Sequence, residues 1–147
     1  MDESFHHLLM LSHVTFQKKV YRNLTSTKLS TGQPKILDFL KTHNGCVQKE
    51  IAIGCQIEPA TVTSLLLPME EIGLIERRME NGNRRSLNVY LTKEGKNMQR
   101  KVEKVFEKLE AAAFQGFSEQ EKEEFMRQFM MIHENIVKCD GEKVEEN

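Results

Sequence analysis

Apolar residues between positions 46 and 78 recur at the spacing of short amphipathic helices. The first helix of this stretch carries Ile51 and Ile57 on one side. The second carries a longer stripe, made of Val62, Leu65, Leu66, Met69, Ile72 and Leu74. The residues between them read GCQIEPA, with a glycine, a polar residue and a proline at a first helical position. This pattern predicts a helix-turn-helix, whose second helix presents small polar side chains beside its buried stripe.

The next residues alternate in a way that predicts a β-hairpin. Residues 74–78 read as one strand, residues 80–86 as a polar tip and residues 87–91 as the returning strand. The hairpin carries four arginines and has little core of its own. Arg84 and Arg85 are therefore predicted to lie across a DNA backbone or in a minor groove.

Longer amphipathic stretches flank this segment. About residues 1–27 are predicted to form a helix with a stripe of His6, Leu9, His13, Phe16 and Val20, widened by Phe5, Leu8 and Leu24. A second helix is expected over about residues 31–42, because Ser30 and Gln33 have the spacing of a capping box. Gly45 is expected to adopt a left-handed conformation after the end of that helix.

Two more helices are predicted at the C-terminal end. Thr92 caps the first, which reaches about residue 115 with a stripe of Met98, Val102, Val105, Leu109 and Ala112. Ser118 and Glu121 form a capping box for the second, which reaches about residue 138 with a stripe of Phe125, Phe129, Ile132 and Ile136. These stripes and the first helix are more apolar than isolated helices could bury. They predict a homodimer with Leu9, Phe16, Leu109, Phe125 and Phe129 in its interface.

The expected fold is mainly α with a small β-wing. Residues 31–92 are expected to form a winged helix-turn-helix DNA-binding domain, and residues 1–30 and 93–139 a helical dimerisation region from both chain ends. Residues 140–147 contain few apolar residues, so they are expected to be a disordered acidic tail. At 147 residues the chain has the size of about one domain and is too short for the nucleotide-binding sheet of a larger enzyme.

Net charge is close to zero, but the charges are polarised along the chain. Residues 77–104 contain nine Lys or Arg against three Asp or Glu, whereas residues 107–147 contain five against eleven. A basic segment beside a helix-turn-helix fits contact with phosphates, and an acidic C-terminal segment fits a surface that faces away from DNA. Ordinary solvated helix faces are the alternative interpretation.

Candidate chemistry is sparse. Cys46, Cys55 and Cys139 form no CxxC pair, and no signal peptide or membrane span is recognised, so the reducing cytoplasm is the expected location, without membrane contact. No HxxxH or CxxC completes the pair His43 and Cys46, so no metal or other cofactor is expected. No nucleophile, base and orienting group stand at motif spacing, so neither a catalytic site nor an enzyme is expected.

The chain resembles the MarR family of bacterial transcriptional regulators in the runs EPATVTSLL, MEEIGLIERR and NRRSLNVYLTKEG. The resemblance covers nearly the whole chain and implies a triangular winged-helix homodimer. Such a dimer binds a pseudo-palindromic operator in double-stranded DNA and is released by a small, often phenolic or anionic, ligand. The candidate DNA-binding residues are Gln48, Lys49, Ala60, Thr61, Thr63, Ser64, Arg78, Asn83, Arg84 and Arg85.

Three positions depart from the family pattern. Asn83 stands where relatives usually carry an aspartate that orients the wing arginines. Ser64 stands where many relatives carry arginine, and no Lys or Arg lies between Pro59 and Ile72, so the recognition helix offers no bidentate arginine for guanine. Pro68 lies inside that helix and is expected to bend its C-terminal half.

The resemblance also places a ligand cleft where the first helix meets the winged unit. The candidate effector-binding residues there are His13, Phe16, Tyr21 and His43. The hydroperoxide-sensing branch has a reactive cysteine in its first helix, and the zinc-sensing branch has a histidine pair in its long helix; this chain has neither, which leaves a small-molecule effector. An aromatic acid would suit a histidine placed among aromatic rings.

Two alternatives to a ligand-released repressor stay open. One is a thiol-switched regulator that uses Cys46 or Cys55, because Cys46 is predicted at the start of a helix, where backbone N–H groups lower a thiol pKa. The other is a winged-helix interaction module that has lost DNA binding. Salt-dependent duplex binding separates the last from the first two, and peroxide sensitivity of that binding separates those two from each other.

Overall fold

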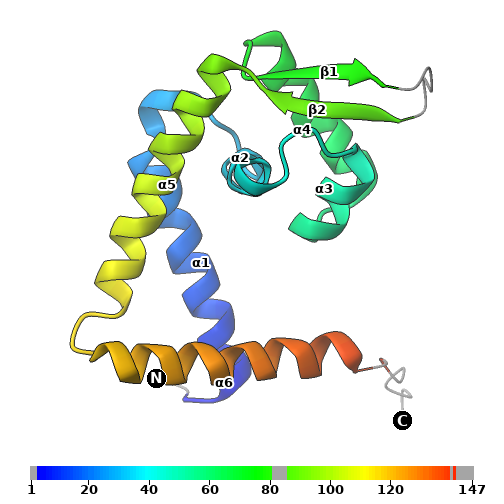
Figure 1. The fold of residues 1–147 in the computed structure, drawn as a ribbon. Helices are drawn as coiled ribbons and strands as arrows, with labels where there is room; N and C mark the ends of the chain where they lie inside the picture. The colour runs from blue at the N-terminus through cyan, green and yellow to red at the C-terminus, as the bar shows by residue number, and fades with distance from the viewer. Residues whose placement is uncertain (1–2, 81–85, 140, 142–147) are drawn as a thin grey trace. The chain divides into compact units, whose positions relative to one another are not determined.

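A computed structural model of the chain describes residues 3–80, 86–139 and 141. Its elements, in order, are α1 (Phe5–Asn23), the short 3-10 helix η1 (Thr25–Thr27), α2 (Gln33–Thr42), α3 (Gln48–Cys55), α4 (Pro59–Glu71), β1 (Ile75–Met79), β2 (Leu87–Leu91), α5 (Lys93–Ala113) and α6 (Glu119–Lys138) (Figure 1). The predicted fold class, mainly α with a small β-wing, is confirmed. By its internal contacts the chain divides into two compact units, Met1–Leu109 and Glu110–Asn147.

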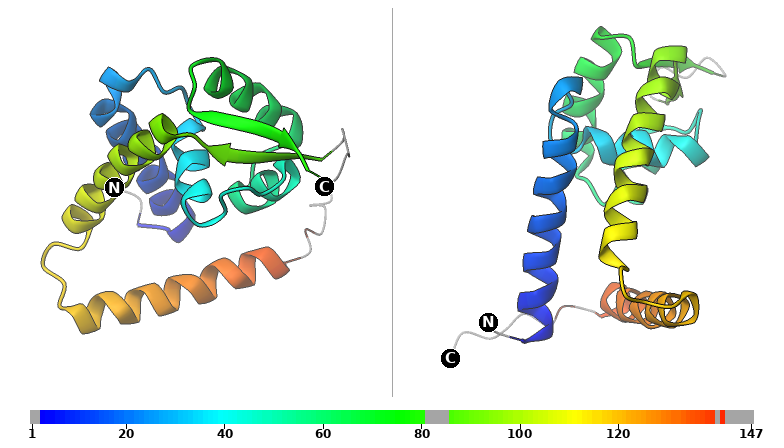
Figure 2. Two further views of the ribbon diagram at one scale, coloured as in Figure 1. Left: turned by 45° about the horizontal axis from the view of Figure 1, so that its top comes forward. Right: turned by 90° about the vertical axis from the view of Figure 1, so that its left-hand side faces the viewer.

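The core of the first unit is built where α2, α3, α4 and the hairpin meet. Its fully buried apolar side chains come from every element of the winged helix and from α5, while α1 adds the buried Val20. The fully buried set includes Ile36, Leu37, Leu40, Ile51, Val62, Leu66, Met69, Ile75, Val89 and Val102. The hairpin lies beside α3 and α4 in the views of Figures 1 and 2. Most of the predicted helix-turn-helix stripe therefore forms one continuous core, whereas Ile57 and Leu65 are only partly buried and Ile72, predicted in the stripe, is exposed at the end of α4.

The two strands form an antiparallel pair in which Ile75 lies opposite Leu91 and Met79 opposite Leu87. The prediction that the first strand starts at residue 74 is wrong by one position. The Leu74 N–H donates to the Met69 carbonyl over 2.9 Å, and Gly73 has φ of 81°. Leu74 thus still belongs to the hydrogen-bonded exit from α4, and the strand begins after it.

The loop between α2 and α3 adds a third, short partner to the sheet. Gly45 adopts the predicted left-handed conformation, with φ of 87°, and its N–H donates to the Val89 carbonyl over 2.8 Å. The Val89 N–H donates in turn to the Cys46 carbonyl over 2.8 Å. Asn88 completes the connection by donating from Nδ2 to the Gly45 carbonyl, also over 2.8 Å. These bonds fix β2 against the start of α3.

Two predicted helix ends differ from the structure. The first helix ends at Asn23 and continues only as η1, and of its predicted stripe, Val20 and the widening residue Leu24 are buried. The second helix starts at Gln33, after Gly32. Only half of the predicted capping box forms, because Gln33 Oε1 accepts from the Ser30 N–H over 2.9 Å while α2 has no side-chain cap. Gly32 occupies the cap position instead.

Gly95 lets the first turn of α5 lie directly against the exit from α4. A Cβ atom at this position would lie 1.9 Å from the Leu74 carbonyl oxygen. The Thr92 hydroxyl supports the same junction, because Oγ1 accepts from the Gly95 N–H over 3.0 Å and donates to the Gly73 carbonyl over 2.6 Å. The predicted capping role of Thr92 is confirmed, and Gly95 provides the close approach.

The second unit consists of the end of α5, a turn and α6. The predicted capping box is present: the Ser118 hydroxyl accepts from the Glu121 N–H, and the Glu121 carboxylate accepts from the Ser118 N–H, each over 3.1 Å. Aromatic rings gather beside it, with the ring centroids of Phe125 and Phe129 5.6 Å apart. Predicted tail residues 140 and 142–147 lie outside the described residues.

Candidate nucleic-acid interface

Helix α4 presents a small polar face to solvent. Gln56 ends α3 in a left-handed conformation, and Pro59 occupies the first turn of α4, where its missing N–H has no cost. Val62, Leu66 and Met69 bury one side of α4 completely. The predicted contact residues are all exposed on the remaining surface: Ala60, Thr61, Thr63 and Ser64. This is the arrangement that a groove-reading helix requires.

Two hydroxyl groups on that face use their protons within α4. Thr63 Oγ1 donates to the Pro59 carbonyl over 3.3 Å, and Ser64 Oγ donates to the Ala60 carbonyl over 3.1 Å. Each hydroxyl oxygen then offers only lone pairs to a partner outside the helix. Gln48 uses one of these acceptors, because its Nε2 lies 3.3 Å from Thr63 Oγ1.

Arg77 on β1 connects the wing to both helices of the helix-turn-helix. Its Nε and Nη2 donate to the two carboxylate oxygens of Glu70 over 2.9 and 3.0 Å, and its Nη1 donates to Gln48 Oε1 over 3.3 Å. Hydrogen bonds from Arg77 lower the pKa of the Glu70 carboxyl, so Glu70 is ionised near neutral pH. The sequence pattern marks Arg77 only as part of the wing charge and gives no signal for Glu70, because their pairing is a tertiary contact.

The other predicted charged contacts are more exposed. Arg78 pairs with Glu76 over 2.9 Å, and its guanidinium lies 4.5 Å from the centroid of the Tyr90 ring. Lys49 is exposed at the first turn of α3, next to Gln48. Asn83, Arg84 and Arg85 lie outside the described residues.

Comparisons with known proteins agree with this geometry. Residues 29–87 match the MarR family. The HTH-type transcriptional regulator YwoH of Bacillus subtilis (strain 168) is 31% identical over 115 residues, which cover 78% of this chain and 83% of YwoH. The chain belongs to the MarR family.

Solved structures extend the similarity over both units of this MarR-family chain. The crystal structure of MarR is 27% identical, with a TM-score of 0.81, and the match covers 93% of this chain and 95% of that one. MepR of S. aureus, crystallised in a complex with DNA, has the same fold at 22% identity and a TM-score of 0.83, over 92% of this chain and 99% of MepR. The protein is therefore a transcriptional regulator with a winged helix-turn-helix, and not an enzyme.

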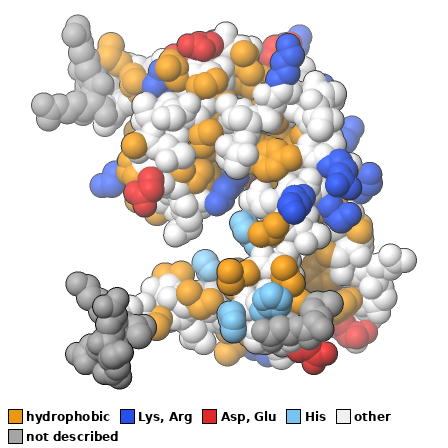
Figure 3. Space-filling view, turned by 180° about the vertical axis from the view of Figure 1, so that it is seen from behind, with side chains coloured by type: hydrophobic (Ala, Val, Ile, Leu, Met, Phe, Trp, Pro, Cys, Tyr) orange, Lys and Arg blue, Asp and Glu red, His pale blue; other side chains and the backbone are white. Residues whose placement is uncertain are grey.

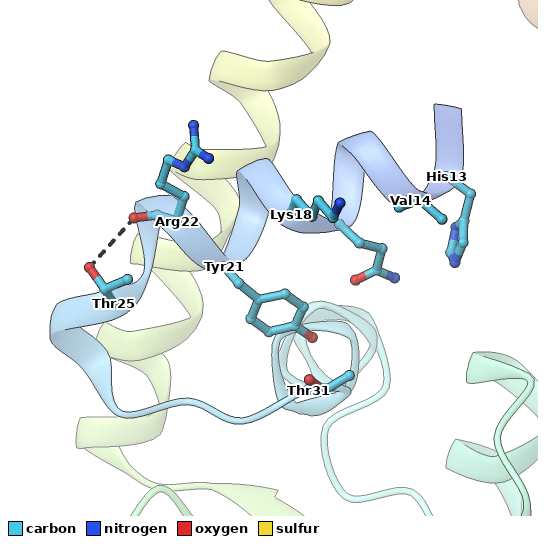
Figure 4. Close-up of a pocket in the computed structure, with 8 residues that line it drawn as sticks. His13, Val14, Lys18, Tyr21, Arg22, Thr25 and Thr31 are labelled. Atoms are coloured by element: carbon cyan, nitrogen blue, oxygen red, sulfur yellow. Dashed lines mark hydrogen bonds between the residues drawn. The ribbon is translucent and has the colours of Figure 1, made fainter. Parts of the chain in front are cut away.

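A groove of about 790 Å³ lies along α1 of this MarR-family protein, facing the segment before α2. His13, Val14, Gln17, Lys18, Tyr21, Arg22, Thr25 and Thr31 line it. Figure 4 shows Tyr21 pointing from α1 toward the start of α2, with Thr31 beside its hydroxyl group. That hydroxyl accepts from the Gly32 N–H over 2.7 Å. Two cationic side chains, Lys18 and Arg22, join the predicted His13 and Tyr21, which suits an anion.

The other two predicted effector residues lie elsewhere. The Phe16 ring stacks on Phe106 of α5, with centroids 6.2 Å apart, and packs against the core. His43 is exposed at the end of α2, where its ring stacks on Phe39 with centroids 4.0 Å apart. Neither residue lines the groove along α1. The structure thus brings together His13 and Tyr21 and leaves Phe16 and His43 apart from them.

The alternative of a thiol switch at Cys46 depends on a pKa lowered by the start of α3, and the structure indicates the opposite direction. Burial raises the pKa of Cys46 to about 11, and it also raises the pKa of Cys55. Both side chains are buried, while Cys139 is exposed. A thiol that stays protonated and covered is a poor nucleophile toward an oxidant, so the structure speaks against a switch at Cys46 or Cys55.

Among the described residues, no group of three His, Cys, Asp or Glu side chains could hold a metal ion. Within the same residues, no single helix has the length and apolar composition needed to cross a membrane. Only α3 and α4 taken together reach those limits, with a bend of 113° between them. Their apolar side chains are the ones that form the buried core.

Proposed function

We propose that this protein binds a pseudo-palindromic operator in double-stranded DNA as a homodimer and represses transcription until a small aromatic or anionic ligand releases it. The main support for this proposal is the exposed face of α4. Its small polar residues lie on a helix whose opposite side is buried through Val62, Leu66 and Met69. Gln48 of α3 reaches this face through its hydrogen bond to Thr63, and the next residue, Lys49, is exposed. The DNA complex of MepR, which shares the fold, supports the same use of the winged helix.

Because α4 lacks Lys and Arg, the wing is expected to provide much of the phosphate contact. Replacing Arg84 and Arg85 by alanine should weaken binding to all duplexes. It should also flatten the dependence of log K on log salt by about 0.9 for each phosphate contact that is lost. Thr61→Ala should instead change the preference among duplexes and leave the slope nearly intact.

Filter binding or fluorescence anisotropy across a salt series measures both quantities, on duplexes selected from a random pool with the purified protein. Arg127→Ala on α6 is the control for the loss of an arginine charge, because its side chain pairs with Glu124 outside the winged helix. An unchanged slope in the wing variant would show that the wing does not touch phosphate. A protein that binds no duplex would support the interaction-module alternative.

Exposed apolar side chains support the homodimer. On α1 they are Phe5, Leu8, Met10, Leu11 and Val14, and on α6 they are Phe125, Met126, Phe129, Met130, Met131, Ile136 and Val137. Figure 3 shows hydrophobic side chains reaching the surface on the face that it draws. Isolated protomers rarely leave so many large apolar groups in water. Of the other predicted interface residues, Leu9 is half-buried, whereas Phe16 and Leu109 pack against the protomer's own core.

We expect sedimentation velocity to give a dimer at micromolar concentration, and Phe129→Asp to dissociate or unfold it, because a carboxylate would replace an apolar contact. Lys138→Asp, which introduces the same group at an exposed polar position of α6, should leave the dimer intact. A stable, folded wild-type monomer at that concentration would contradict the assembly that we propose.

The groove along α1 is the proposed effector site. Benzoate, as the simplest aromatic acid, should release DNA. To do so it must have a higher affinity for the dimer conformation that cannot bind the operator than for the conformation that can, because equal affinity for the two conformations would not shift their populations. His13→Ala and Lys18→Ala should each reduce benzoate-dependent release while leaving the DNA affinity without ligand within a few-fold. Lys19→Ala is the matched control, because Lys19 is exposed on the same helix and does not line the groove.

Release is measured as the benzoate concentration that halves binding to the selected duplex. The groove is the wrong site if the Lys18 and Lys19 variants respond alike. If His13→Ala loses folding or dimerisation instead, His13 is an interface residue, and the site has to be sought elsewhere.

A further inference from the structure

Gln48 is the one predicted DNA-contact residue whose side-chain amide is held at both ends among the described residues. Its Oε1 accepts from Arg77 Nη1 over 3.3 Å, and its Nε2 donates to Thr63 Oγ1 over 3.3 Å. The two partners come from β1 and from α4, so the amide joins three elements. Such an amide cannot rotate without losing both bonds.

The identity of Arg77 determines which end of the amide faces which partner. A guanidinium has five N–H donors and no acceptor, so only the oxygen of Gln48 can face it. Arg77 is itself fixed, because its Nε and Nη2 form a two-pronged pair with the Glu70 carboxylate. Its side chain is only 17% exposed, and its charge is balanced by Glu70. Arg77 is therefore better placed to orient a neighbour than to contact phosphate.

We propose that Arg77 is a positioning residue that sets the base preference of Gln48: it turns Oε1 toward the wing strand, so that the second N–H of Nε2 is the group that Gln48 offers to DNA. This inference rests on the proposed function, because it assumes that Gln48 contacts a base edge. A glutamine reads adenine by using its oxygen and its nitrogen together on N6 and N7. With the oxygen turned toward Arg77 and one N–H on Thr63, Gln48 cannot make that two-point contact and donates instead to a single acceptor, such as guanine O6 or thymine O4.

The recognition helix fits this division of roles. The Thr63 and Ser64 hydroxyl groups donate to backbone carbonyls of α4, so their oxygens can act only as acceptors toward DNA. Gln48 then supplies one donor beside a helix face that supplies acceptors. A recognition surface without Lys or Arg thus gains a directional donor whose orientation is set by an arginine on the wing strand.

Arg77→Lys tests the proposal, because lysine keeps the positive charge but lacks the fork that holds Glu70 and Gln48 at once. Duplexes are selected from a random pool with the wild type, Arg77→Lys, Gln48→Ala and the double variant, all as full-length protein. The position whose preference disappears in Gln48→Ala is the one that Gln48 reads. At that position Arg77→Lys should raise the relative affinity for adenine by about tenfold, the size of one direct base contact. The double variant should equal Gln48→Ala alone.

The salt dependence of binding gives a second readout. Arg77→Lys should leave the log–log slope unchanged, unlike the loss of a phosphate contact. Arg127→Lys is the matched control, because Arg127 makes the same two-pronged pair with Glu124, over 3.0 and 2.6 Å, on α6. It should alter neither the preference nor the slope. If Arg77→Lys does not fold, Glu70→Gln replaces it, because it weakens the ion pair that holds Arg77. Glu70→Gln should shift the base preference at the same position toward adenine.

Three results would overturn the inference. The first is that Arg77→Lys and Glu70→Gln both leave the base preference at the Gln48 position unchanged. The second is that these variants change the preference equally at every position of the duplex. The third is that Gln48→Ala selects the same sequences as the wild type. In each of these cases the wild type still selects its own duplexes, so the proposed function stands. If the wild type selects no duplex at all, the proposed function fails first.

Discussion

Gly95→Ala is expected to abolish or severely reduce folding of the winged helix. The added Cβ would lie 1.9 Å from the Leu74 carbonyl oxygen, and this atom belongs to the backbone, so no side-chain rotation can relieve the overlap. The first turn of α5 would have to move away from the exit of α4 and lose the hydrogen bonds of Thr92 to Gly73 and Gly95. A free-energy loss above about 3 kcal/mol is expected, at the upper end of single substitutions.

Urea denaturation followed by circular dichroism measures this loss. Gly141→Ala is the control, because a Cβ there meets nothing within 4 Å. The interpretation of the junction is wrong if Gly95→Ala unfolds at the same urea concentration as the wild type.

Leu66→Ala is expected to destabilise the protein by about 2 to 5 kcal/mol. The Leu66 side chain is fully buried in the middle of α4, so its loss leaves a cavity beneath the recognition face. DNA affinity measured at a temperature where the variant is still folded should fall less than stability does, because no contact residue is removed.

Leu67→Ala provides a matched comparison one residue further along α4. Its side chain is 48% exposed, so the same truncation should change stability by well under 1 kcal/mol, as surface substitutions usually do. Equal melting temperatures for the two variants would contradict the packing of α4. A large effect of Leu67→Ala alone would mean that Leu67 is covered in the assembled protein.

The sequence predicted the buried side of the helix-turn-helix well because that side follows a strict period. Val62, Leu66 and Met69 are fully buried, as their spacing requires. The stripe of the first helix was as regular, yet in the protomer only its end at Val20 and Leu24 is buried. Periodicity identifies the side of a helix that is apolar, and it does not identify what covers that side.

Local chemistry was harder to predict than periodicity. The Ser118 capping box forms in full, whereas Ser30 contributes only its backbone N–H because Gly32 takes the cap position of α2. The position of Cys46 at the start of α3 left a reactive thiol open as an alternative, but burial outweighs the helix terminus and raises the pKa of that thiol. The hydrogen bond between Arg77 and Gln48 joins residues 29 positions apart, and a helical or strand periodicity cannot predict such a contact.

The pairing of residues 45 and 46 with Val89 has a mechanical consequence. Because the loop before α3 is hydrogen-bonded to the returning strand of the wing, β2 and the start of α3 are expected to move together. A ligand in the groove along α1 cannot detach the wing alone without breaking these bonds. Under the proposed function, the ligand would then release DNA by changing the distance between the two winged helix-turn-helix domains of a dimer. The two domains would no longer fit half-sites spaced about one helical turn apart, although the structure of each domain would stay the same.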